Sequence, residues 1–172
     1  MKFSGTCYRV HDPRWSFKPL SGDGAAIHGG RFNPKGVAAL YLSLDLVTAV
    51  REGNQGFAGK IEPCVLCSYE VDCTDITDLR TDAARAAAGV AFEELASPWA
   101  MLALERKPIP SQRLAARLIA DGQAGVLVPS FAVGSASDSH NLVLWRWGPA
   151  LPCRVTVHDP SGRLPKSQLS WD

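Results

Sequence analysis

Short apolar segments of strand length stand at both ends of the chain, and this arrangement constrains the fold more than any other feature. They occur at residues 6–10, 37–43, 64–71, 125–129, 142–147 and 154–158. The middle of the chain is instead rich in Ala and Leu, which favours helices. We predict these helices over 82–95, over a short stretch from Pro98, and over 111–121. Strands at both ends with helices inserted in the middle favour an α+β fold over a doubly wound parallel sheet.

A further short helix is expected directly after the segment at 37–43. Asp45 can cap its start, and it runs to Arg51 or Glu52. Its apolar side is predicted to consist of Leu46, Val47 and Val50. The stretches 11–36 and 54–62 are rich in Gly or polar residues and are expected to be mostly loop.

The length and the net charge limit the number of domains and the kinds of ligand that we expect. A chain of 172 residues suits one domain, so we expect a single domain over 1–172. The net charge of +1 argues against direct nucleic-acid binding, which needs an excess of cations. No signal peptide and no membrane-spanning run is recognised, so we expect a cytoplasmic protein without membrane contact.

The five cysteines do not form a recognisable metal site. Cys64 and Cys67 make a C-x-x-C, but residues three apart on a strand point to opposite faces, and no second pair completes a zinc set. An odd number of cysteines without an export signal indicates reduced thiols. We therefore predict no metal.

The segment His28-Gly29-Gly30-Arg31-Phe32-Asn33-Pro34-Lys35-Gly36 is the most unusual one. Gly30 lets the backbone approach a ligand closely, and the Arg31 fork suits phosphate oxygens. Asn33 can hold a turn or bind a ligand hydroxyl. The segment is neither a Walker loop nor a Rossmann fingerprint. An anion-binding loop and a plain turn with a solvated arginine both remain open.

Polar residues outside this loop are the other candidates. Tyr41 and Ser43 share one face of a strand, where the Tyr41 ring can stack on a flat ligand. Glu52 ends the following helix, and a carboxylate there can stabilise a cationic ribose. Arg9, Ser130 and Asn141 each adjoin an apolar strand, where a structural role is the alternative.

Together these residues resemble the RES-domain family, the toxin half of RES–Xre toxin–antitoxin pairs. The resemblance begins at Tyr8-Arg9 and is strongest at Gly29-Gly30-Arg31-Phe32-Asn33. It continues through Tyr41-Leu42-Ser43 and Glu52 to Val128-Pro129-Ser130 and Asn141-Leu142-Val143-Leu144, so it covers roughly residues 6–147. The stretch around 74–121 looks longer and more helical than in shorter members, and Arg31 stands where diphtheria-toxin-like transferases have a His.

The resemblance implies an ADP-ribosyltransferase-like mixed β core that binds NAD⁺ as substrate and cleaves its nicotinamide–ribose bond. Arg31, Tyr41 and Glu52 are the implied catalytic residues. The implied NAD⁺-binding residues are Arg9, Gly30, Arg31, Asn33, Tyr41, Ser43, Ser130 and Asn141. An Xre-type antitoxin would cover the active site.

The acceptor of the ADP-ribose stays open at this point. Transfer to a host protein is favoured because the longer middle segment can shape an acceptor site. Hydrolysis or phosphorolysis that depletes NAD⁺ is the alternative. A non-catalytic module that binds a nucleotide or a partner is the rival from another class. An RNase-type toxin fits less well, since the four His residues form no recognisable pair.

Overall fold

The computed structural model describes residues 1–54 and 60–171 and is built on one seven-stranded sheet. The strand order is β4-β5-β6-β2-β1-β3-β7. The strands are β1 Phe3–His11, β2 Leu40–Ser43, β3 Val65–Cys73, β4 Ile76–Asp78, β5 Gly125–Pro129, β6 His140–Leu144 and β7 Cys153–Val157. β4 and β5 pair in parallel, and the other neighbouring pairs are antiparallel. The sheet is therefore mixed, as predicted.

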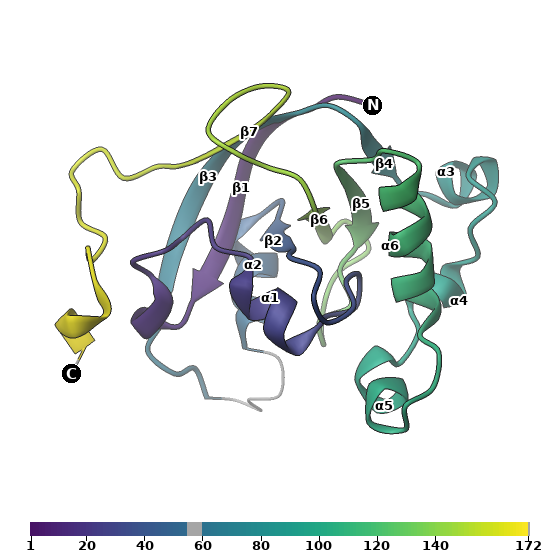
Figure 1. Cartoon of the computed structure of the whole chain (residues 1–172), viewed down its shortest axis with the longest axis horizontal. Coiled ribbons are helices and arrows are strands. Elements are labelled where there is room, and N and C mark those ends of the chain that lie inside the picture. The colour runs from purple at the N-terminus through teal and green to yellow at the C-terminus, as the bar shows by residue number, and fades with distance from the viewer. Residues whose placement is uncertain (55–59, 172) are drawn as a thin grey trace.

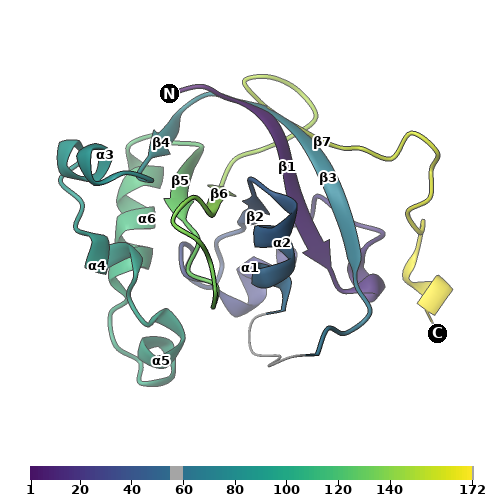
Figure 2. The ribbon, with the colours of Figure 1, turned by 180° about the vertical axis from the view of Figure 1, so that it is seen from behind.

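The helices are α1 Asp23–His28, α2 Leu46–Gly53, α3 Asp82–Ala87, α4 Phe92–Leu95, α5 Trp99–Leu104 and α6 Pro110–Ala120. Two 3₁₀ turns, η1 Pro13–Trp15 and η2 Gln168–Trp171, add to these. Helices α3 to α6 are grouped beside β4 and β5 at one edge of the sheet, and the segment after β7 runs along the opposite edge (Figures 1 and 2). The α+β class, with helices inserted in the middle of the chain, is confirmed.

Alternation along the central strands divides their side chains between two apolar clusters. One cluster lies on the face away from α6 and includes Tyr69, Leu40, Leu42, Leu127, Leu142 and Leu144. The other joins the sheet to α4 and α6 and includes Val126, Val128, Val143, Leu95, Leu114 and Leu118. The inserted helices are thus packed on the same face of the sheet as the Tyr41 ring, which contacts the second cluster.

Helix α2 begins where the sequence indicated, but its orientation differs from the prediction. Asp45 caps it by accepting a hydrogen bond from the Thr48 amide at 2.8 Å. The predicted apolar side is wrong, because Leu46 and Val47 are 48% and 58% exposed and the buried residues are Thr48 and Ala49. The small Ala49 side chain lets the helix lie close to the sheet and brings Glu52 toward its surface.

Other differences from the predicted elements have local causes. The helix expected over 82–95 is divided into α3 and α4, with Gly89 in a left-handed conformation between them (φ 62°). Helix α6 begins at Pro110, one residue before the predicted start, with Ile109 as the N-cap. Helix α1 and the three-residue strand β4 were not predicted, since both are too short to show a period.

The expectation of reduced thiols is wrong for one pair of cysteines. Cys73 and Cys153 stand directly opposite each other on β3 and β7 and are joined by a disulfide. Cys7 and Cys67 are free and buried, and Cys64 is free and exposed. None of the helices in the described part of the chain has the length and apolar character to cross a bilayer.

Candidate active site

The Gly-Gly-Arg segment forms a tight turn between α1 and β2. The Gly30 amide donates to the Asn33 carbonyl at 2.9 Å and closes the turn. A Cβ atom at Gly30 would lie 2.6 Å from the Tyr41 hydroxyl oxygen and 2.7 Å from Asn33 Oδ1. Only glycine fits there, so the turn lies directly against β2.

Asn33 is fully buried and holds this turn from inside. Its Nδ2 donates to the carbonyls of Ala25 and Val37, both at 2.8 Å, and more weakly to that of Pro34 at 3.3 Å. Its Oδ1 accepts from the Tyr41 hydroxyl at 2.6 Å. The structure therefore engages the whole Asn33 amide in local contacts and does not place it among the cavity-lining residues.

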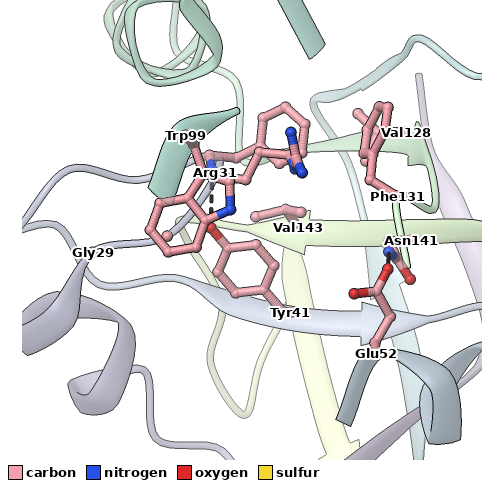
Figure 3. A pocket seen from close by; sticks show the side chains of 11 residues that line it. Gly29, Arg31, Tyr41, Glu52, Trp99, Val128, Phe131, Asn141 and Val143 are labelled. Atoms are coloured by element: carbon pink, nitrogen blue, oxygen red, sulfur yellow. Dashed lines mark hydrogen bonds between the residues drawn. The ribbon is translucent and has the colours of Figure 1, made fainter. Parts of the chain in front are cut away.

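Tyr41 joins the turn to the sheet. Its hydroxyl donates to Asn33 and accepts from the Phe32 amide at 3.0 Å. Burial raises the pKa of the Tyr41 phenol above its ordinary value, which keeps the proton on it at neutral pH. Its ring lines a cavity together with Arg31 (Figure 3).

The Arg31 guanidinium is held by the inserted helical segment. Nη1 donates to the carbonyls of Leu95, at 3.1 Å, and Ser97, at 2.6 Å. The Phe131 ring lies 4.5 Å from the guanidinium carbon, within the range of a cation–π contact. Burial lowers the pKa of Arg31, while Glu52 and Tyr41 act in the opposite direction. An arginine remains charged under such a shift, so the cavity contains a fixed cation.

Glu52 is held at the other side of the cavity by two strands. Ser130, directly after β5, donates to Glu52 Oε1 at 2.6 Å. The Asn141 amide on β6 donates to the same oxygen (Figure 3). Ser43 donates to Asn141 Oδ1 at 2.8 Å. Because Ser130 gives its only proton to Glu52, Ser135 is the donor in their 2.9 Å contact.

Two cavities adjoin Glu52. The first, of about 200 Å³, is lined by Gly29, Gly30, Arg31, Phe32, Tyr41, Glu52, Trp99, Val128, Phe131, Asn141 and Val143. The second, of about 230 Å³, is lined by Tyr8, Arg9, Val10, Tyr41, Leu42, Ser43, Ala49, Glu52, Gly53 and Asn141. Tyr41, Glu52 and Asn141 belong to both. The structure thus brings together Gly30, Arg31, Tyr41, Ser43, Glu52, Ser130 and Asn141 of the predicted site.

Arg9 is not brought into this group. Tyr8 pairs with Ser43 and faces the cavities, so strand alternation directs the Arg9 side chain to the opposite face. There its guanidinium donates to the Ser21 carbonyl at 3.2 Å, close to Tyr69 and Cys67, and burial lowers its pKa. Arg9 is one of the residues that line the second cavity, but its guanidinium lies on the opposite face of the sheet and binds the loop at Ser21.

Several residues of the site were not predicted. Trp99 and Phe131 line the first cavity and Tyr8 the second, and Gln112 contacts the turn from α6. The pairing of β1 with β2 turns Tyr8 toward the second cavity, whereas the sequence favoured its neighbour Arg9 in the Tyr8-Arg9 motif. Trp99 and Gln112 lie on helices whose packing no local pattern specifies. No group of three or more His, Cys, Asp or Glu residues suited to a metal occurs within 1–54 and 60–171.

Comparison with known proteins identifies a family model and a solved structure. The model of the RES domain matches residues 6–168. The chain is also similar to the toxin–antitoxin complex MbcT–MbcA of M. tuberculosis, with 27% identity and a TM-score of 0.58. That match covers 84% of this chain and 75% of the other, and it agrees with the expected ADP-ribosyltransferase-like fold. No curated protein sequence matches the chain significantly.

The contacts of Tyr41 predict a cost in stability when its hydroxyl is removed. Tyr41→Phe leaves the Phe32 amide and Asn33 Oδ1 without their partner, so we expect the free energy of unfolding to fall by about 1–3 kcal/mol. Denaturant unfolding measures the change. Tyr8→Phe is the matched control, since no hydrogen bond of the Tyr8 hydroxyl is found among the described residues, and it should change stability by less than about 0.5 kcal/mol. Equal effects in the two variants would contradict this reading of the site.

Proposed function

The chain belongs to the RES-domain family, and from this we propose that it is the toxin of a toxin–antitoxin pair that binds NAD⁺ and cleaves its nicotinamide–ribose bond. The observation that carries the proposal is the convergence of the Arg31 guanidinium, the Tyr41 ring and the Glu52 carboxylate on one cavity. A cation for the pyrophosphate or the ribose, a flat ring for nicotinamide and a carboxylate for a cationic sugar are the groups that this reaction requires.

The reaction is the departure of nicotinamide from the anomeric carbon of the ribose. The C–N bond breaks with its electron pair going to nicotinamide, which leaves as a neutral molecule, and positive charge develops on the ribose. Glu52 stabilises this charge because Ser130 and Asn141 hold its carboxylate in a fixed position. Arg31 binds the anionic part of the substrate, and the Tyr41 ring stacks on the nicotinamide. Positioning and electrostatics then supply the acceleration.

Loss of either charged group should abolish nicotinamide release. Glu52→Gln keeps an oxygen that accepts from Ser130 and Asn141 but removes the negative charge. Arg31→Ala removes the cation. We expect each variant to lose at least about a hundredfold in the rate of nicotinamide release, measured by HPLC after mixing with NAD⁺.

Two results would separate this proposal from its rivals. Glu93→Gln is the matched control, since Glu93 is exposed, and it should release nicotinamide at the normal rate while all variants unfold at similar temperatures. Near-normal turnover by Glu52→Gln and Arg31→Ala would refute the assignment. A wild-type protein that binds NAD⁺ without releasing nicotinamide would be a non-catalytic binding module.

The favoured acceptor of the ADP-ribose is a protein. Trp99, which lines the cavity, lies on α5. Met101 on the same helix and Phe92 on α4 are 52% and 45% exposed. Exposed apolar residues near a cavity suit a macromolecular partner better than water or phosphate. The acceptor nucleophile then forms a bond to the anomeric carbon that nicotinamide has left.

Labelled NAD⁺ distinguishes the acceptors. After incubation with NAD⁺ labelled in the adenylate part and with host lysate, we expect a labelled protein band that is absent with Glu52→Gln. Free ADP-ribose alone would indicate a glycohydrolase, and a phosphorylated ADP-ribose formed only in phosphate buffer would indicate a phosphorylase. Either of these results would overturn transfer to a protein and retain the cleavage.

The partner is an Xre-type antitoxin that covers the active site. The M. tuberculosis neighbour is one half of a toxin–antitoxin complex, and the exposed apolar residues of α4 and α5 offer a surface next to the cavity. An antitoxin seated there would close the entry to Arg31 and Glu52. Binding and inhibition would then be the same event.

Addition of the cognate antitoxin should suppress nicotinamide release in proportion to the toxin bound. Met101→Asp places a charge on this surface, and we expect it to weaken the inhibition about tenfold or more. Leu169→Asp is the control, because Leu169 is 78% exposed in the C-terminal segment at the opposite edge of the sheet (Figure 1). Equal inhibition of both variants would place the antitoxin elsewhere.

A further inference from the structure

The first turn of α6 contacts the Arg31 turn through the side chain of Gln112. Its Nε2 donates to the Gly30 carbonyl at 2.8 Å and to the Asn33 carbonyl at 3.2 Å. These are the two residues whose backbone groups close the turn. A single amide from a helix about eighty residues further along the chain thus holds both sides of the segment that presents Arg31.

The same turn of α6 also holds the groups that bind the guanidinium. Ser111, next to Gln112, accepts a hydrogen bond at 3.1 Å from the Ser97 hydroxyl, and both side chains are buried. The carbonyl of Ser97 accepts from Arg31 Nη1 at 2.6 Å. The backbone of Arg31 is therefore fixed through Gln112, and its side chain is fixed through Ser111 and Ser97.

Fixing a long side chain in advance matters for binding. A free arginine side chain loses rotamer entropy when a ligand immobilises it, and this loss weakens binding. Here the two carbonyls engage Nη1. Among residues 1–54 and 60–171 no hydrogen bond of Nε or Nη2 is found, so these atoms remain able to donate to an anionic ligand.

We propose that Gln112 and Ser111 are positioning residues for Arg31, and that the inserted helical segment thereby sets the affinity of the site for NAD⁺. The proposal rests on the proposed function, since NAD⁺ is the ligand that Arg31 binds there. Neither residue lines the cavity, and both act through the Arg31 turn or its carbonyl partners.

The test measures NAD⁺ binding in a protein that does not turn it over. In the Glu52→Gln background, titration calorimetry gives the Kd for NAD⁺ with and without Gln112→Met, which keeps the length of the side chain and removes both N–H donors. We expect Gln112→Met to raise the Kd about tenfold when Arg31 is present, and less than about twofold in Arg31→Ala. Arg113→Ala, an exposed change on the same helix, should leave the Kd unaltered.

A general loss of structure would give a different pattern. In that case Gln112→Met would weaken binding equally with and without Arg31, and this additive result would overturn the proposal. An unchanged Kd in both backgrounds would also overturn it, because the hydrogen bonds would then have no effect on the site.

Hydrogen exchange separates this inference from the proposed function. In the ligand-free protein, Gln112→Met should speed exchange of the Gly30 amide, which is bonded in the turn, whereas Arg113→Ala should not. If the wild type neither binds nor cleaves NAD⁺ while this amide responds, the proposed function is wrong and the positioning role stands. If the wild type binds NAD⁺ and neither measurement responds to Gln112→Met, the positioning role is wrong and the proposed function stands.

Discussion

The Tyr41 hydroxyl, buried between the Phe32 amide and the Asn33 side chain, is the contact on which the site depends. This hydroxyl fixes the turn that carries Arg31 against β2. The register of β2 is set in turn by its pairing with β6 and β1. The position of Arg31 is therefore tied to the strand order of the sheet and not to the turn alone. Loss of this contact would leave two buried polar groups without partners, which is costly in a protein interior.

The Glu52 carboxylate, on the other side of the cavity, is positioned by the close packing of α2 on the sheet. Helix α2 lies close to β1 and β2 because small residues face the sheet, and Glu52 follows in its last turn. Ser130 and Asn141 then approach it from β5 and β6, which are far away in the sequence. Close packing of α2 is thus what makes the carboxylate part of the cleft. The exposure of Leu46 and Val47 follows from the same orientation.

The sequence predicted the features that depend on neighbouring residues, and it predicted less well the side-chain positions that depend on how strands and helices pack. The strand at Gly125–Pro129 and the Asp45 cap could be predicted, because a short apolar run and an N-cap need only neighbouring residues. Arg31, Tyr41 and Glu52 could be predicted as a group from their resemblance to a family. The direction of Arg9 depends on the pairing of β1 with β2, and the contact of Gln112 depends on how α6 packs, so neither was available from local patterns.

The partners of Arg31 explain how the cavity keeps a positive charge available. Arg31 is bound by two backbone carbonyls and an aromatic ring, and Glu52 accepts from a hydroxyl and an amide. The carbonyls and the ring that contact Arg31 are neutral, so they fix the guanidinium without cancelling its charge. A cation and a carboxylate on one cavity can act on different parts of the same ligand. An ion-paired arginine would first have to give up its partner, and the inserted helical segment removes that cost by supplying carbonyls in its place.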